Sequence, residues 1–362
     1  MSISSCSTKG HTWSDKFSLQ TLEVIDGILG PIYSINQLNG CGGDEVYLLK
    51  SKEHKKLVVK KLRPDFTFTE NEIKYTIWAS DNDIGPKLYS HYNNELVMEC
   101  LEELASESSE FSEHPRDAIS FTDRDVVNQM KRMHSIDSDN TNFVSQSYKV
   151  FQEEKRQAGV SPRCMQPMFQ YVEETMELLS KSDSSIAICH NDLHLRNMLF
   201  SGMDLKFIDW PFAGSDYVLV DIAQTAALIQ IRPDELLDQY YGVGFGSDDP
   251  SKFPSGIKEA DKLLKDRRSS TGESNEVRDS LEEIYSRVIP LPYAYRVCFP
   301  LIGLDVTADE IDRLWEEGDF LLYRDCFSLL NKGKLDLSDP DKRVKFSLSM
   351  LHGFYRHLEY KF

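Results

Sequence analysis

Three polar side chains, Asp192, Asn197 and Asp209, follow one another closely in the segment IAICHNDLHLRNMLFSGMDLKFIDW (residues 186–210), and a short apolar run precedes each acid. Phosphoryl transfer uses such an H-x-D-L-x-x-x-N arrangement, because a carboxylate must orient and deprotonate the attacking hydroxyl while an amide oxygen holds Mg²⁺. A second carboxylate would bind the metal ion that bridges the nucleotide phosphates. The segment therefore predicts Asp192 as catalytic base and Asn197 and Asp209 as Mg²⁺ ligands.

A polar turn with acids placed by chance is the competing interpretation of the same segment. Any one acid alone would favour that interpretation, whereas the joint spacing of the three residues favours phosphoryl transfer. Asp192 also has a structural alternative, in which its carboxylate only accepts hydrogen bonds from backbone N–H groups of its own turn. The effect of removing the carboxylate separates the two roles.

The N-terminal half contains residue types that would bind a nucleotide. Lys60 ends an apolar run, from which its ammonium can reach the α and β phosphates, while Lys61 is expected to point to the opposite face and into solvent. Glu72 lies on the following helix and could pair with Lys60. Three glycines between two expected strands would let backbone N–H groups approach phosphate oxygens: Gly40, Gly42 and Gly43. Each feature alone is more often a turn or a solvated charge, but their order along the chain favours a nucleotide site.

Hydrophobic periodicity predicts that these residues lie in an N-terminal lobe, residues 1–101, with an antiparallel sheet and one helix. Asn93–Asn94 is a hairpin signal between its last two strands. The helix is expected over 68–80, and the strands are expected over 31–38, 45–50, 56–62, 87–91 and 95–100.

Helical patterns dominate the rest of the chain, residues 102–362, after a Ser- and Glu-rich linker at 102–120. The sequence there predicts helices over 122–134 (with a capping-box-like start at Thr122), 166–181, 219–231 and much of the last eighty residues. Residues 245–280 read as a long surface loop. The fold class predicted is α+β and bilobed, with an antiparallel N-terminal sheet and a mostly helical C-terminal lobe.

Composition limits the classes of partner. The chain has 41 Lys and Arg against 59 Asp and Glu, a net charge of −18, which disfavours nucleic acids and anionic membranes and tolerates a cationic substrate. There is no apolar signal segment at the N-terminus and no run long enough to span a membrane. Seven scattered cysteines without a C-x-x-C pair fit a reducing compartment. We therefore expect a cytoplasmic location.

The sequence resembles the aminoglycoside phosphotransferase and choline/ethanolamine kinase superfamily, small-molecule relatives of the protein kinases. The resemblance covers about residues 36–230. It rests on CHNDLHLRNMLF (189–200), FIDW (207–210), DIA (221–223) and IWASDNDIGPKLYSHYNNELVMECLE (77–102). It implies a bilobed kinase-like fold with ATP in the cleft between the lobes.

The resemblance also implies roles for single residues. Asp192 corresponds to the catalytic base, Asn197 and Asp209 to the metal ligands, and Lys60 and Glu72 to the phosphate-binding lysine and its helix partner. His190 and Asp221 match positions that brace the catalytic loop. The hinge residues whose backbone groups contact adenine would be Met98, Glu99 and Cys100.

The nucleotide loop GCGGDEVY departs from the family pattern. Asp44 stands where many members have Asn or Ser, and Glu45 replaces the third glycine of protein kinases. Two acids near a triphosphate would be repulsive unless they point outward. Trp210-Pro211 replaces the Phe-Gly of protein kinases, and no A-P-E follows, which favours the small-molecule branch without a movable activation segment.

Three functions remain open at this point. The leading hypothesis is an ATP-dependent, Mg²⁺-requiring kinase acting on a hydroxyl of a small, cationic or polyol substrate, with choline- or ethanolamine-like amino alcohols first and aminoglycosides or sugars second. The alternatives are a kinase with a protein substrate and a non-catalytic nucleotide-binding scaffold. Aromatic residues of the C-terminal half could enclose a quaternary ammonium, although such residues more often form the core: Tyr240, Tyr241, Tyr285, Tyr293, Tyr295 and Trp315.

Overall fold

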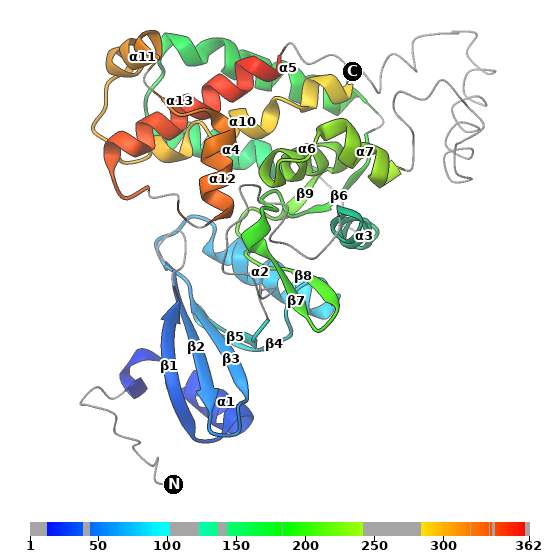
Figure 1. Cartoon of the computed structure of the whole chain (residues 1–362), viewed down its shortest axis with the longest axis vertical. Coiled ribbons are helices and arrows are strands. Elements are labelled where there is room, and N and C mark those ends of the chain that lie inside the picture. The colour runs from blue at the N-terminus through cyan, green and yellow to red at the C-terminus, as the bar shows by residue number, and fades with distance from the viewer. Residues whose placement is uncertain are drawn as a thin grey trace, which may run out of the picture. The chain divides into compact units, whose positions relative to one another are not determined.

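The computed structural model (Figure 1) describes residues 13–38, 44–101, 123–136, 143–182, 184–241, 284–318, 320–332, 334 and 337–358. The chain divides into two compact units. The first unit is Met1–Glu107 with Asn197–Ala213, and the second is Ser108–Arg196 with Gly214–Phe362. The glycines of the predicted nucleotide loop, Thr122 and the predicted 245–280 loop lie outside the described residues.

A five-stranded antiparallel sheet forms the centre of the first unit. Its strands run in the order β1-β2-β3-β5-β4, and each strand lies within a residue or two of its predicted range. The bounds are β1 (Ile32–Leu38), β2 (Glu45–Ser51), β3 (Lys56–Lys61), β4 (Leu88–Tyr92) and β5 (Glu95–Glu99). Asn93, with a φ of 51°, begins the tight turn between β4 and β5, as the sequence predicted.

Helix α1 (Leu19–Leu29) covers one face of this sheet and was not predicted. Its buried residues Ile25 and Leu29 pack with Leu57 of β3 in one apolar cluster. Ser18 caps the helix, and Glu95 of β5 accepts hydrogen bonds from the Ser18 amide at 3.0 Å and hydroxyl at 2.8 Å. A short 3-10 helix, η1 (Trp13–Lys16), precedes α1.

Helix α2 (Thr69–Asp81) ends in a turn that holds the hairpin of β7 (Met198–Ser201) and β8 (Asp204–Phe207). The Phe207 amide donates to the Ile84 carbonyl at 2.9 Å. Gly85 permits this approach, because a Cβ there would lie 3.2 Å from the Phe207 carbonyl oxygen. These contacts place 197–213 with the first unit, although in sequence the segment follows the predicted boundary at residue 101. The division at residue 101 itself stays a prediction.

The second unit is mostly helical, as predicted. The apolar helix α6 is buried along its whole length. A two-stranded antiparallel ladder joins β6 to β9. The elements are α3 (Asp123–His134), α4 (Gln146–Ala158), η3 (Arg163–Met165), α5 (Gln166–Lys181), β6 (Ile186–Cys189), η4 (Leu195–Asn197, ending in the first unit), β9 (Gly214–Tyr217), α6 (Val218–Ile229), α7 (Pro233–Tyr241), α10 (Leu291–Ala294), η6 (Phe299–Leu301), α11 (Ala308–Glu317), α12 (Tyr323–Asn331) and α13 (Pro340–His357).

The predicted α+β class is confirmed, since all strand pairs of the described chain are antiparallel and the helices dominate the second unit. Within the part of the chain that the structure describes, none of the helices combines the length and the apolar character needed to cross a membrane.

Candidate active site

Lys60 of β3 lies at the centre of a charged cluster in the first unit. Its Nζ is 2.9 Å from Glu72 Oε1 of α2, 2.5 Å from Asp209 Oδ1 after β8, and 3.6 Å from Asp44 Oδ2 before β2. The predicted ion pair between Lys60 and Glu72 is therefore present. The structure adds Asp209 and Asp44 to it, so that three carboxylates surround one ammonium.

The carboxylates keep Lys60 charged. Burial alone would lower the pKa of its ammonium, but Asp209, Glu72 and Asp44 together raise that pKa above its ordinary value. Burial also raises the pKa of Glu72, and the Lys60 charge opposes this rise. A buried ammonium of this kind is a suitable partner for phosphate oxygens, which would compete with Asp209 and Asp44 for it.

The two acids of the nucleotide loop point in different directions. Glu45 is half-exposed and lies 3.7 Å from Lys61 Nζ, on the other face of the sheet from Lys60. Asp44 points inward, where its Oδ1 accepts a hydrogen bond from the Arg63 amide at 3.1 Å. The Lys61 side chain lies on the opposite face of β3, as predicted, and donates to the Lys16 carbonyl at 2.7 Å. Glu45 therefore points away from the expected position of the triphosphate, whereas Asp44 points toward Lys60 and would repel the phosphates.

Asn197 directly precedes β7, and Asp209 follows β8 by two residues, so both lie at the open end of the β7–β8 hairpin. The amide of Ile208, which precedes Asp209, donates to the Asn197 carbonyl at 3.0 Å, so the two residues leave the hairpin near one another. Asp209 has a φ of 70°, a left-handed conformation that is uncommon outside glycine and costs free energy. Asn197 is buried and Asp209 only partly so. Amide and carboxylate oxygens are the ligands that Mg²⁺ prefers, so this pair fits the predicted metal.

The segment after Asp209 is fixed to the first unit. Asn71 of α2 donates from Nδ2 to the Pro211 carbonyl at 2.6 Å and to the Ala213 carbonyl at 2.8 Å. Trp210 is buried, and its indole N–H donates to the Phe207 carbonyl at 3.2 Å. These hydrogen bonds tie the segment to α2 and β8, and the absence of a movable activation loop stays a prediction.

The predicted hinge residues lie at and just after the end of β5. The Glu99 amide donates to the Lys87 carbonyl at 2.9 Å, and the Glu99 carboxylate accepts from the Ser201 hydroxyl at 2.7 Å. The Glu99 N–H is therefore already in use. An adenine contact would depend on the remaining backbone groups of Met98, Glu99 and Cys100.

Asp192 lies in the second unit, in the loop after β6. Its Oδ1 accepts a hydrogen bond from Nη2 of Arg296 at 2.8 Å, and His194 Nε2 is 3.9 Å from its Oδ2. Asp192 therefore has a cationic partner, so it does not serve only its own turn. Arg296 could not be predicted from the sequence, because it follows Asp192 by more than a hundred residues and belongs to no motif.

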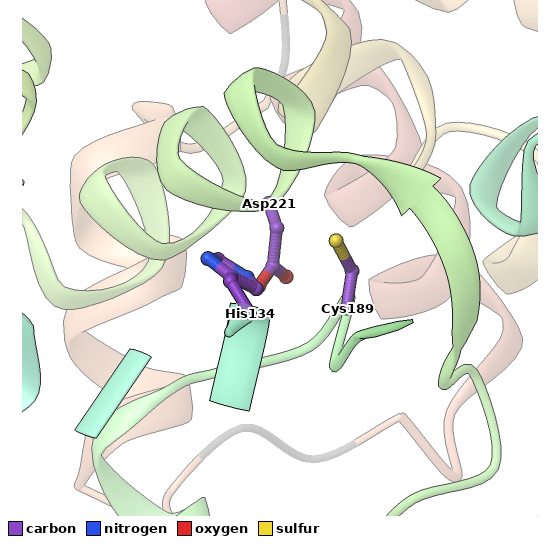
Figure 2. Close-up of side chains that lie close together, drawn as sticks. All are labelled: His134, Cys189 and Asp221. Carbon is purple, nitrogen blue, oxygen red and sulfur yellow. The ribbon is translucent and has the colours of Figure 1, made fainter. Parts of the chain in front are cut away.

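Asp221 of α6 braces the loop that carries Asp192. Its Oδ1 accepts from the Asn191 amide at 2.8 Å, and Asn191 has a φ of 64°. Its Oδ2 lies 2.9 Å from Nε2 of His134, the last residue of α3 (Figure 2). Since a carboxylate oxygen only accepts, Nε2 is the donor. His190, which the resemblance also placed in this brace, is fully buried.

Cys189 lies beside the same pair, as Figure 2 shows, and the possible ligand atoms of His134, Cys189 and Asp221 all lie within 4.8 Å of one another. Both Asp221 oxygens and both His134 ring nitrogens already have hydrogen-bond partners, with the Tyr240 hydroxyl 2.8 Å from Nδ1. Burial raises the pKa of the Cys189 thiol. The group therefore acts as a hydrogen-bonded brace. His134 was part of a predicted helix, but the sequence did not show its contact.

Comparison with known proteins decides the family. The choline/ethanolamine kinase model matches residues 35–227. The chain belongs to the choline/ethanolamine kinase family. Human ethanolamine kinase 2 is 26% identical to it over 163 residues, which are 42% of this chain and 41% of that protein. Mouse ethanolamine kinase 1 is 25% identical over 169 residues, 42% of this chain and 45% of that protein.

This member of the choline/ethanolamine kinase family thus matches less than half the length of those relatives. A crystal structure of a choline/ethanolamine kinase family protein from Mesorhizobium loti has a TM-score of 0.51 to this chain at 13% identity, covering 94% of this chain and 100% of the other. At that identity the likeness concerns the fold, and it confirms the predicted kinase-like fold class.

Proposed function

We propose that this chain is an ATP-dependent kinase that transfers the γ-phosphate to a hydroxyl of a small molecule, with choline- or ethanolamine-like amino alcohols first and aminoglycosides or sugars second. The observation that supports this most is the cluster in which Lys60 contacts Glu72 at 2.9 Å and Asp209 at 2.5 Å. A lysine that is paired with a helix glutamate and lies beside a candidate metal ligand is the arrangement that kinases use to hold ATP phosphates.

Asn197 and Asp209 would hold Mg²⁺, and the ion, when bound, supplies positive charge to the nucleotide phosphates. Lys60 adds a second positive charge, and Glu72 keeps its ammonium in place. Asp192 accepts the proton of the acceptor hydroxyl as that oxygen bonds to the γ-phosphorus, while the bond from the γ-phosphorus to the bridging oxygen breaks and ADP leaves. The backbone groups of Gly40, Gly42 and Gly43, and those of Met98, Glu99 and Cys100, would complete the nucleotide site.

Lys60→Ala should weaken Mg·ADP binding by more than about tenfold, because a charge-assisted hydrogen bond contributes about 1.5–3 kcal/mol. Lys61→Ala should change it less than about twofold, since Lys61 lies on the other face of β3. Titration calorimetry of both variants measures the difference. Equal losses would show that Lys60 is not the phosphate-binding lysine.

Asp44→Asn should have the opposite effect and tighten Mg·ADP binding, because Asp44 competes with phosphate for Lys60 at 3.6 Å. We expect about a tenfold gain, equivalent to about 1.4 kcal/mol. The matched control is Glu45→Gln, which removes a charge one residue away on the other face of the sheet. Unchanged or weaker binding by Asp44→Asn would mean that Asp44 does not oppose the nucleotide.

The acceptor class is tested by measuring ATP turnover with a panel of amino alcohols, aminoglycosides and sugars, without added protein. Stimulation by an amino alcohol supports the first choice. Turnover only with a protein would favour a protein kinase, and nucleotide binding without any turnover would favour a scaffold. Three of the six residues of the predicted aromatic cage pack in the interior: Tyr285 donates to the Pro233 carbonyl, Tyr293 stacks on His357, and Tyr295 donates to Met176. The other three, Tyr240, Tyr241 and Trp315, are only partly buried, and a cage built from them stays a prediction.

A further inference from the structure

Arg296 is held in place by more than its contact with Asp192. Its Nη1 donates to the Pro292 carbonyl at 3.1 Å and lies 3.5 Å from Gln224 Oε1, while Nη2 donates to Asp192 at 2.8 Å. Arg296 and Asp192 both belong to the second unit, and both are partly exposed. A guanidinium fixed by its own neighbours restricts the rotamers of the carboxylate that it contacts.

A second carboxyl group, that of Glu154 on α4, lies near this pair. Its side chain is 95% buried, and in the described part of the chain its Oε2 accepts no hydrogen bond. Arg296 and Asp192 are the charged groups that act on it. The guanidinium is thus bonded to one carboxylate, that of Asp192, and its charge also acts on a second, buried carboxyl group that has an unused acceptor.

The environment of Glu154 keeps it neutral near pH 7. Burial raises the pKa of its carboxyl to about 8, with Arg296 lowering that pKa and Asp192 raising it. Among the described residues, Arg296 and Asp192 are the charged groups that act on Glu154, while Lys155, the next residue of α4, acts on the nearby Cys298 thiol. Cys298, before η6, has a thiol pKa raised to about 12 by burial, and Asp216 of β9 is held by the Ser145 hydroxyl and the Ser147 amide.

We propose that Arg296 is a positioning residue for Asp192, and that Glu154 controls this contact by competing for the guanidinium when its carboxyl is ionised. The inference rests on the proposed function in that Asp192 is taken as the base. While Glu154 is protonated, the guanidinium has one anionic partner and stays on Asp192. When Glu154 loses its proton to solvent, its free oxygen becomes a second anionic acceptor, and Asp192 is no longer held in one orientation.

Two pH dependences follow. Turnover should fall as the pH rises through about 8. The free energy of unfolding should also depend on the ionisation of Glu154. Folding raises the pKa of this acid from about 4.5 to about 8. Its contribution to stability is therefore complete below about pH 4.5 and is lost as the pH rises to about 8. Glu154→Gln keeps the shape of the side chain and cannot ionise, so it should remove the pH dependence of turnover and that of folding stability.

The activity arm of the experiment measures kcat and KM from pH 6 to 9.5 with the acceptor found by the panel. We expect Arg296→Ala to lower kcat at least about tenfold with little change in the KM for ATP, and Arg296→Lys to restore part of the loss. Glu154→Gln should abolish the fall of kcat above pH 8. The matched control Glu153→Gln removes a charge from the exposed neighbour that pairs with Arg156, and it should keep the wild-type profile.

The second arm needs no turnover. The carboxyl resonance of Glu154 should titrate near pH 8 in the wild-type protein, higher in Arg296→Met and lower in Asp192→Asn, since each change removes one of its charged neighbours. Such coupling without turnover on any acceptor would support the electrostatic link between Arg296 and Glu154 and reject the proposed function alone. Titration of Glu154 near its ordinary pKa of 4.5, or a fall of kcat that persists in Glu154→Gln, would overturn the inference.

Discussion

Asp192→Asn should fold, bind Mg·ADP as the wild-type protein does, and turn over at least about 10²-fold more slowly, the usual loss when a general base is removed. Phosphoryl transfer needs little covalent help, but the hydroxyl must be aligned and must lose its proton. Asparagine keeps the shape and can still lie beside Arg296, but it cannot accept the proton. The measurements are thermal unfolding, ADP titration and kcat on the same preparation.

A purely structural Asp192 predicts something else. Stability would then fall, and the remaining activity would follow the folded fraction. The matched control is Asp305→Asn, an exposed acid of the same unit, which should leave all three quantities unchanged. Near-normal turnover by a folded, nucleotide-bound Asp192→Asn protein would refute the role as base and favour the non-catalytic alternative.

Local patterns predicted the sheet of the first unit and missed the helix that covers it. The β4–β5 hairpin is encoded by adjacent residues, with Asn93 adopting the positive φ that the turn requires. Helix α1, in contrast, depends on Glu95, which holds its cap from 77 residues away. The helix carries local signals of its own, with Ser18 at its N-cap and Ile25 and Leu29 four residues apart on its buried face, but no pattern near it in the sequence points to Glu95.

The same limit applies to the site. Lys60 and Glu72 are twelve residues apart on consecutive elements, and their pairing follows from a strand followed by a helix. The direction in which the Asp44 side chain points is set by a hydrogen bond that its carboxylate accepts from the amide of Arg63, which lies after β3. Arg296 reaches Asp192 only because a helical region far along the chain folds back to it, and no motif marks that region.

Asp209→Asn should abolish turnover, since the Asp209 carboxylate has two roles that the substitution removes together. Asp209 is the candidate ligand for Mg²⁺, and it is also the nearest partner of Lys60 at 2.5 Å. Asparagine retains one oxygen but loses the negative charge that a hard dication requires. We therefore expect the gain in nucleotide affinity that Mg²⁺ provides to disappear. Binding of ADP in EDTA should become tighter, because Lys60 then has one competitor fewer.

The control for this prediction lies in the same hairpin. Asp204 is exposed at the start of β8, so Asp204→Asn should leave turnover and Mg²⁺ dependence unchanged. Measuring ADP affinity with and without Mg²⁺ in both variants separates loss of the metal from loss of the fold. Turnover of the wild-type protein that persists in EDTA would refute the metal role of Asp209, and phosphoryl transfer would then depend on Lys60 and other groups of the protein for positive charge.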